Sequence, residues 1–362
     1  MNRRVRWILV ANLALFFAFF GAILARSTTP LLAGAGGQAT KGAFTPPRGL
    51  EKLPIAVPPD NEMTTGRIEL GKQLFFDMRL SRTKKMSCET CHVPEKGWTD
   101  GLALSPRHDG SMNTRHTPTM YGVAFYPDLY WDGRARGLET QILAAWRSQM
   151  GADPDAIAKE LAEVPRYVEA FQKAYDGPPS GDRIVKALAS FVRTIHAGDT
   201  AWDRSPQDPA APPKTAIARG FQVFSTNGCV VCHTPALFSD TQFHNVGVGA
   251  DKPNPDMGRG RILADAATKN SQPVTPEIER LMGAFKTPSL RGAVLSGPYF
   301  HDGSVKTLDE AVDLMVKGGL DNKNKDVLLQ PRTLTADQRR DLMAFLEALT
   351  PDKTPYTRPK PW

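Results

Sequence analysis

After its first 40 residues, the sequence has no block rich in lysine or arginine. Those 40 residues hold four arginines and no acidic residue, which leaves 41 basic against 38 acidic side chains in the remainder. A nucleic-acid partner is therefore not expected. Stretches typical of β-strands are also hard to find, which favours a mostly α-helical protein. Cysteine is scarce, and the four present all lie in two short motifs.

The composition is that of an ordinary folded protein. The 362 residues are 41% hydrophobic and 23% charged, enough for a sizeable core and most simply two domains. The 30 prolines and 30 glycines indicate long irregular connections between helices.

Residues 1–40 have the pattern of a signal anchor, or of a signal peptide, followed by a linker. MNRRVR, with three arginines, precedes an apolar run over 7–25 that only Asn12 interrupts. This run is longer than a usual signal-peptide core and close to the ~20 residues that span a bilayer. The arginines are expected to stay in the cytoplasm, so the rest is exported. We expect a periplasmic body anchored to the inner membrane by residues 7–25, although AGA at 33–35 leaves cleavage open.

Cys-x-x-Cys-His occurs twice, as CETCH at 88–92 and CVVCH at 229–233. Two disulfides, a thioredoxin-like redox pair or a four-cysteine zinc site would use the same cysteines. None of these explains why histidine follows both times, whereas Cys-x-x-Cys-His is the attachment pattern of c-type haem. We therefore predict two covalent haems, attached through Cys88, Cys91, Cys229 and Cys232. His92 and His233 are the expected proximal ligands of the iron.

The rest of the sequence suggests one haem domain around each motif. A glycine stands four residues before a phenylalanine ahead of each, in GKQLFF at 71–76 and GFQVF at 220–224, and amphipathic helices are expected near 182–198 and 335–350. Thr335 and Gln338 fit a capping box at the start of the second of these helices, and Thr307 and Glu310 are expected to cap the helix that carries Met315. Four prolines in SPQDPAAPPK indicate a stiff linker. The predicted fold is two mostly α-helical, cytochrome c-like domains in tandem after the N-terminal segment. Its boundaries are 1–40 for the leader and linker, 44–204 and 215–350 for the domains, 205–214 for the proline-rich linker and 351–362 for a tail.

Several longer motifs follow one another in a specific order, namely LGKQLFFDMRLSRTKKMSCETCH, RHTPTM, YWDGRARGLETQ, FKTPSLRG and PYFHDGS. In this order the chain resembles the bacterial diheme cytochrome c peroxidases, whose superfamily includes the MauG enzymes, from about residue 50 to 350. The resemblance implies that the N-terminal domain is peroxidatic and that the C-terminal domain transfers electrons.

The resemblance also implies the sixth ligands of the two irons. Met315 stands where the family methionine completes the C-terminal haem, although by its own pattern it would be a core residue. MauG enzymes have tyrosine there instead. His108 resembles the displaceable distal histidine of the N-terminal haem, although by local sequence it would be a loop residue. Trp131 resembles the tryptophan that carries electrons between the haems, and packing is its ordinary alternative.

Two positions depart from the peroxidase pattern. Gln149 aligns with the glutamate that serves as acid/base in peroxide cleavage, and an amide cannot supply that proton. MauG enzymes resemble this chain in having glutamine there, and Glu139 is a carboxylate that could substitute but is expected to face elsewhere. His116 replaces an asparagine that helps hold an interdomain calcium, and imidazole is a poor calcium ligand. Carbonyls of Ser296 and Pro298 could still bind calcium.

Three further histidines have ordinary expected roles. His301 resembles a family histidine near the C-terminal haem, where we expect it to hydrogen-bond. His244 fits a structural residue. His196, at the end of an amphipathic helix, is expected to be its C-terminal cap.

The predicted activity is reduction of hydrogen peroxide to water with electrons from a small cytochrome c or a cupredoxin. A MauG-like enzyme that oxidises tryptophan or tyrosine side chains of a partner is the first alternative, favoured by Gln149 and opposed by Met315. A non-catalytic diheme electron carrier is the second. The resemblance leaves a homodimer open.

Overall fold

The computed structural model describes residues 44–205, 212–352 and 356–362. The predicted anchor at 7–25 and most of the proline-rich linker lie outside these residues. Within the described part of the chain, no helix combines the length and the apolar character needed to cross a membrane.

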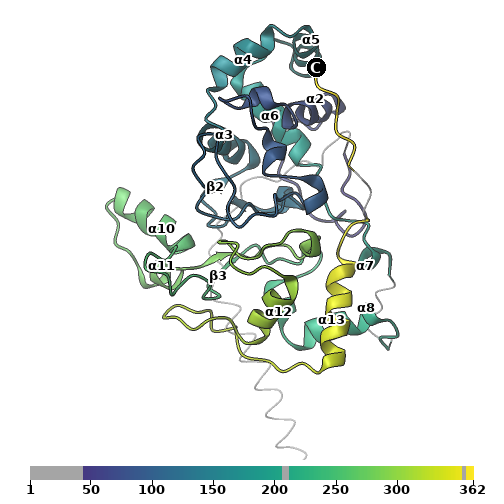
Figure 1. Ribbon diagram of the computed structural model, residues 1–362, viewed down its shortest axis with the longest axis vertical. Helices are drawn as coiled ribbons and strands as arrows, with labels where there is room; N and C mark the ends of the chain where they lie inside the picture. Colours follow the sequence, from purple (N-terminus) through teal and green to yellow (C-terminus); the bar gives the residue numbers. More distant parts are fainter. Residues whose placement is uncertain (1–43, 206–211, 353–355) are drawn as a thin grey trace, which may run out of the picture. The chain divides into compact units, whose positions relative to one another are not determined.

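The described residues are mostly helical, as predicted (Figure 1). The first half contains α2 (Thr65–Phe75), α3 (Leu138–Gln149), α4 (Pro154–Ala162), α5 (Pro165–Tyr175) and α6 (Gly181–Val192), followed by the short α7 (Ala201–Arg204). The second half contains α8 (Ala216–Thr226), α9 (Cys229–Cys232), α10 (Gly258–Lys269), α11 (Pro276–Arg280), α12 (Leu308–Val316) and α13 (Ala336–Ala348). Short 3₁₀ turns lie at Met78–Leu80, Cys88–Thr90, Pro94–Lys96, Val123–Phe125 and Ala293–Leu295.

Extended structure is limited to two antiparallel pairs of two-residue strands. β1 (Asp128–Leu129) pairs with β2 (Ala135–Arg136), and β3 (Phe243–His244) pairs with β4 (Phe285–Lys286). These strands are too short to form a sheet with a core of its own. They fix the loops between the helices instead.

α2 packs against α6 to form the first core. Gly71 allows this close approach, because a Cβ there would lie 1.9 Å from the carbonyl oxygen of Ala187. Phe75, one turn later, is fully buried and touches Phe191 of α6 at 5.3 Å between ring centroids. The predicted apolar stripe of α6 is buried throughout.

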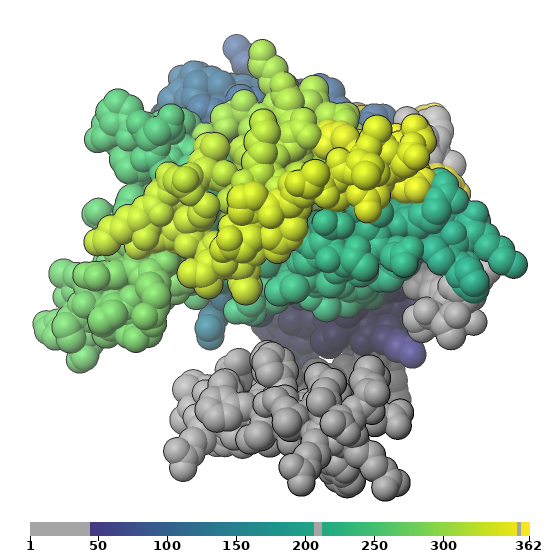
Figure 2. Space-filling view, turned by 90° about the horizontal axis from the view of Figure 1, so that it is seen from below, coloured from purple at the N-terminus to yellow at the C-terminus, as the bar shows by residue number. Residues whose placement is uncertain are grey.

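α8 and α13 repeat this arrangement in the second half. A Cβ on Gly220 would lie 2.0 Å from the carbonyl oxygen of Asp341, and the rings of Phe224 and Phe345 are 5.1 Å apart. Figure 2 shows the two helices, teal and yellow, side by side on one face. Thr335 and Gln338 form the predicted capping box at the start of α13. The glycine-to-phenylalanine pattern therefore marks equivalent helices in the two halves.

Two arginine clusters join the halves. Arg291 of the second half bonds both carboxylate oxygens of Asp203 in α7 at 2.8 Å, and both side chains are 2% exposed. Arg115 bonds Asp132 in its own half and Asp256 in the other. Buried pairs with two hydrogen bonds fix the relative orientation of the segments that they join.

His196 does not cap α6, contrary to the prediction. The helix ends at Val192 with Arg193 as its C-cap, and His196 lies four residues beyond that end. Its ring is stacked between Phe44, at 5.2 Å, and Phe125, at 4.9 Å. Burial among these rings lowers the pKa of His196 to about 4, so the imidazole is neutral and cannot complement a helix dipole.

Candidate functional site: two haem-attachment segments

The first attachment segment is a tight turn. A 3₁₀ turn spans Cys88–Thr90, and the backbone N–H of His92 donates to the carbonyl of Cys88 at 3.1 Å. His92 Nδ1 donates to the carbonyl of Trp98 at 2.8 Å. With Nδ1 carrying the proton, Nε2 has the free electron pair that a metal requires. Burial lowers the pKa of His92, which keeps the ring neutral.

The second attachment segment has the same design. α9 covers the motif, the N–H of His233 donates to the carbonyl of Cys229 at 2.9 Å, and His233 Nδ1 donates to the carbonyl of Phe238 at 3.0 Å. Burial lowers the pKa of this imidazole as well. Each half thus presents one oriented, neutral histidine directly after a cysteine pair.

The cysteines fit thioether attachment better than the alternatives. All four are free, so neither predicted disulfide alternative is formed. Burial raises the pKa of Cys88 to about 12 and that of Cys91 to about 11, which keeps these sulfurs neutral. A zinc site needs thiolates, and among the described residues the four cysteines form no common cluster. The donor set therefore fits two covalently attached haems.

His108 and Gln149 lie together, as the resemblance implies for the distal side of the N-terminal haem. The backbone N–H of His108 donates to the carbonyl of Gln149 at 2.9 Å. The ring packs against Gly151, where a Cβ would lie only 2.5 Å from Cε1 of His108. Arg107 closes the hairpin loop through Ser111 and reaches the carbonyl of Ser148 at 2.5 Å. The structure brings the two residues together, and their distal role remains a prediction.

Glu139 faces away from this place, as predicted. It stands at the start of α3, ten residues before Gln149 and roughly 15 Å along the helix. Its carboxylate accepts from Arg193 at 2.7 Å and from Asn61 at 2.9 Å. Burial alone would raise the pKa of Glu139, but the bond and charge of Arg193 outweigh it and lower the pKa. A carboxylate held ionised cannot act as a proton donor at neutral pH.

Trp131 is bonded to both halves. Its indole N–H donates to the carbonyl of His116 at 2.8 Å, and its own carbonyl accepts from the N–H of Lys286 in β4 at 2.8 Å. His116 in turn donates its backbone N–H to the carbonyl of His301. Trp131 therefore lies at the junction of the halves, where the predicted electron-transfer role requires it.

The junction also holds the residues considered for calcium. The imidazole of His116 is buried, bonds the carbonyl of Leu102 at 2.8 Å and faces the backbone of Ser296. The Ser296 hydroxyl donates to Ala293. The ring of His301 stacks on Phe285 at 3.6 Å between ring centroids. These contacts use His116 and His301 within the protein, and calcium binding remains a prediction.

Sequence reasoning missed a buried lysine beside Trp131. The ammonium group of Lys286 lies over the ring of Tyr126 at 3.3 Å, and burial lowers the pKa of Lys286 to about 7. The only sequence signal was the position of Lys286 within FKTPSLRG. A lysine and a tyrosine from opposite halves therefore meet next to the predicted electron path.

Met315 lies near the end of α12 and is half-buried. Thr307 and Glu310 form the predicted capping box of this helix. Leu308 and Val312, on the same stripe, pack against the second core. The helix is thus anchored by its first two turns, and the ligand role of Met315 remains a prediction.

His244 has the structural role expected of it. Its Nδ1 bonds Asp326 at 2.5 Å and its Nε2 bonds Asp240 at 2.9 Å. The hydrogen bond with Cys232 and the two carboxylates raise the pKa of His244 to about 10. Cys232, Asp240 and His244 could hold a metal by distance alone, but Cys232 is the expected thioether sulfur. We therefore assign this cluster to the support of the second attachment segment.

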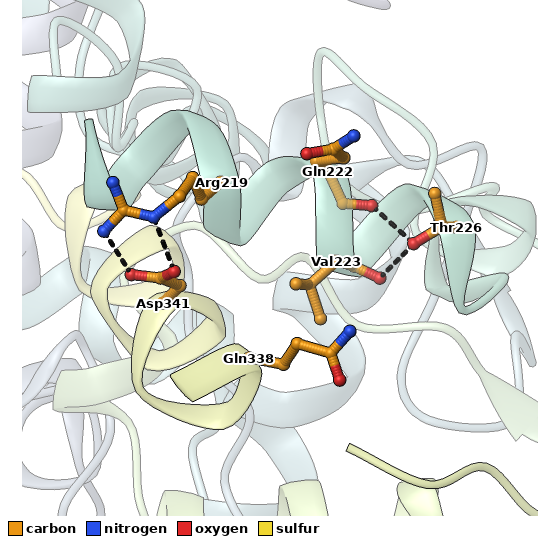
Figure 3. A pocket seen from close by; sticks show the side chains of 6 residues that line it. All are labelled: Arg219, Gln222, Val223, Thr226, Gln338 and Asp341. Atoms are coloured by element: carbon orange, nitrogen blue, oxygen red, sulfur yellow. Dashed lines mark hydrogen bonds and ion pairs between the residues drawn. The ribbon is translucent and has the colours of Figure 1, made fainter. Parts of the chain in front are cut away.

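A polar recess of about 310 Å³ lies on the outside of the second half, between α8 and α13 (Figure 3). Arg219 bonds Asp341 across it at 2.7 Å, and Thr226 bonds the carbonyls of Gln222 and Val223. These polar groups either hold α8 against α13 or bond the backbone at the end of α8. The recess carries none of the predicted site residues.

Comparisons with known proteins agree with this geometry. Residues 65–210 match the family Di-haem cytochrome c peroxidase, and residues 217–350 match Cytochrome c. The chain is 34% identical to methylamine utilization protein MauG of Methylorubrum extorquens, over 84% of this chain and 83% of that one. It is 33% identical to cytochrome-c peroxidase IdrP1 of Pseudomonas sp. strain SCT, over 82% and 84%. A crystal structure of a MauG-like protein associated with microbial copper homeostasis superimposes with a TM-score of 0.72 at 29% identity, over 88% of this chain and 96% of that one. The chain, with its two c-type haem domains, belongs to the diheme cytochrome c peroxidase/MauG family.

Proposed function

We propose that this protein is a diheme peroxidase that reduces hydrogen peroxide to water, with electrons from a small cytochrome c or a cupredoxin. The observation that carries the proposal is the pair of oriented histidines, one per half, with Trp131 bonded to both halves between them. The reaction consumes H₂O₂, two electrons and two protons and gives two water molecules. When bound, the two haems supply the redox chemistry.

The residues have distinct proposed roles. His92 and His233 would hold the irons, and Met315 would complete the C-terminal site, where a methionine ligand would raise the reduction potential and suit the site to accept electrons. His108 would cover the N-terminal site as a displaceable residue, whose loop could move aside to admit peroxide. The support for this movement is that the loop with His108 has the exposed residues Asp109, Gly110 and Ser111 at its tip and joins the end of α3 through few bonds, those of the His108 N–H and the Arg107 guanidinium, beside the ring packing on Gly151.

Gln149 is proposed to orient peroxide through its amide, since an amide both donates and accepts hydrogen bonds. It cannot supply the proton, and Glu139 is held by Arg193. The protons for water formation therefore come from solvent that reaches the distal side.

We place the protein in the periplasm, tethered to the inner membrane by residues 7–25. The apolar run behind MNRRVR and the two haem-attachment motifs support this location. Calcium at the junction would depend on carbonyls such as those of Ser296 and Pro298, because the His116 imidazole already bonds Leu102.

Peroxide turnover tests the proposal. The purified protein is poised with one haem reduced and mixed with hydrogen peroxide and a reduced small cytochrome c. Catalytic oxidation of the cytochrome is expected. His108→Ala should react with peroxide even in the fully oxidised protein, and continued inertness of this variant would disprove the gating role of His108.

A MauG-like oxidase is the second candidate, favoured by the glutamine beside His108. It predicts a long-lived oxidised spectrum after peroxide without cytochrome turnover. No spectral response at all would instead support a diheme electron carrier, which requires His108 to stay bound in every redox state.

A further inference from the structure

We propose that residues 356–362, called the strap below, close the attachment side of the N-terminal haem domain and so restrict electron entry to the C-terminal haem. This inference rests on the proposed function, because it concerns how electrons reach the peroxidatic site. The strap follows α13 along the chain but lies on the first half, beside α2 and α5 (Figure 1).

Arg358 ties the strap to the first attachment segment itself. Its guanidinium bonds Glu89, which stands between the two cysteines of that motif. It also bonds both carboxylate oxygens of Glu95, each at 2.7 Å. One side chain thus joins the turn that carries the two cysteines to the following 3₁₀ turn, Pro94–Lys96.

Tyr356 covers the aromatic side chains behind this turn. Its ring stacks on Phe76 at 5.6 Å and meets Trp98 edge-on at 5.2 Å. Trp98 provides the carbonyl that orients His92. Tyr356 and Trp362 pack against the same core as Cys88 and Cys91. The strap therefore lies over the segment that holds and orients the proximal ligand.

Trp362 fixes the far end of the strap. Its ring meets Tyr167 of α5 at 4.8 Å, and its backbone oxygen accepts from Arg79 at 2.8 Å. Arg79 and Tyr167 both bond Asp77, so these contacts form one network. Anchors at Tyr356, Arg358 and Trp362 hold the strap along its whole length.

The second attachment segment is different. The positions of Glu89 and Thr90 are taken there by Val230 and Val231, and Val231 is 54% exposed. Thr90 is exposed in the first segment as Val231 is in the second, so the two segments differ in chemistry: Glu89 bonds the strap, whereas the apolar Val230 stands at the corresponding position.

The test measures reduction of the N-terminal haem directly. Protein with its C-terminal haem already reduced is mixed with hexaammineruthenium(II), a cation, or with dithionite, which supplies an anionic reductant. Each reductant gives one electron to ferric iron and is itself oxidised by one electron. Deletion of residues 356–362 should accelerate this reduction with both reagents, and Arg358→Ala should do so about fivefold by weakening the strap.

The controls distinguish shielding of the haem by the strap from the change in charge when Arg358 is removed and from a general loosening of the protein. Removing Arg358 exposes two carboxylates, which would attract the cation alone, so acceleration by only the ruthenium reagent would refute shielding. Arg280→Ala, which breaks an exposed pair with Glu277 elsewhere, should leave the rate unchanged. Arg358→Lys should restore most of the slow rate. An unchanged rate in the deletion variant would overturn the proposal.

A second readout does not depend on the haems. Limited proteolysis of the intact chain, read by mass spectrometry, should cleave Arg358→Ala within residues 350–362 faster than the unmodified protein. Equal cleavage would mean that Arg358 does not hold the strap. Because neither readout uses peroxide, failure of the strap and failure of the peroxidase proposal are distinguishable.

Discussion

Removal of Arg115 should weaken the junction of the two halves more than any exposed charge change. Its guanidinium bonds Asp132 at 2.6 Å in the first half and Asp256 at 2.6 and 2.9 Å in the second. Asp132 directly follows Trp131 and is 2% exposed. Arg115→Ala would therefore leave a buried carboxylate without its main partner.

The expected loss of stability in Arg115→Ala depends on the interactions that Asp132 and Asp256 keep. Removing one partner of a buried ion pair costs about 3–5 kcal/mol. Asp132 would still bond Arg134 at 2.9 Å, and Asp256 is 31% exposed, so both carboxylates keep some compensation. We expect a loss at the lower end, about 3 kcal/mol in the free energy of unfolding. Arg115→Lys should lose less stability, because lysine restores the positive charge but cannot bond Asp132 and Asp256 in the geometry of the guanidinium.

The free energy of unfolding that Arg115→Ala loses should depend on pH. Burial alone would raise the pKa of Asp256, but the hydrogen bond and charge of Arg115, together with the hydrogen bond from the Gly258 N–H, outweigh it and hold the pKa below its ordinary 3.8. A carboxyl with a lowered pKa stabilises the folded state above the unfolded-state value and loses that contribution as the pH falls through the folded-state value. The difference between the unmodified protein and Arg115→Ala should thus be full at pH 7 and shrink below about pH 4.

Guanidinium unfolding of the haem-loaded protein, followed by far-UV circular dichroism at pH 7 and below pH 4, measures the free energy of unfolding of each variant. Arg134→Ala is the matched control, because Arg134 is 41% exposed and bonds the same carboxylate, so its loss should cost under about 1 kcal/mol. If Arg115→Ala cost no more than Arg134→Ala, the junction would not depend on this ion pair.

Three other changes have defined outcomes. Met315→Ala should lower the reduction potential of the C-terminal haem in a redox titration, on the order of 0.1 V within the ~0.8 V that axial ligands span; an unchanged potential would exclude Met315 as a ligand. Gln149→Glu should speed peroxide cleavage in stopped-flow mixing, because a carboxyl can carry the proton that an amide cannot, and no change would place another group at the distal side. Gly71→Ala should cost about 1–3 kcal/mol in guanidinium unfolding, because its Cβ would meet a backbone carbonyl at 1.9 Å; a neutral result would mean that α2 and α6 can separate freely.

Local patterns predicted much of the fold. The α6 and α13 stripes, the capping boxes at Thr307 and Thr335 and the paired glycines depend on neighbours three or four residues apart. Each of these patterns involves residues that lie close together in the sequence, so it can be recognised without the structure. The family resemblance gave His108 and Gln149 separate roles at the N-terminal haem, and the backbone bond between them is a finding of the structure.

Contacts between distant segments were not predictable in this way. Arg358 stands more than 260 residues after Glu89 and Glu95, and no periodicity links an exposed tail to a turn so far away. Helices α10 and α11 were not predicted, because few of their residues are buried apolar side chains. His196 was misjudged because its partners, Phe44 and Phe125, come from two other segments.

The support of His92 and His233, the predicted proximal ligands, has a consequence for how the two haem sites can differ. Both imidazoles donate to a main-chain carbonyl, of Trp98 in one half and of Phe238 in the other. A carbonyl is present whatever the side chain, so single substitutions cannot readily grade the electron donation of either ligand. The proposed difference between the two haem sites then has to come from other groups, namely Met315, His108 and the strap.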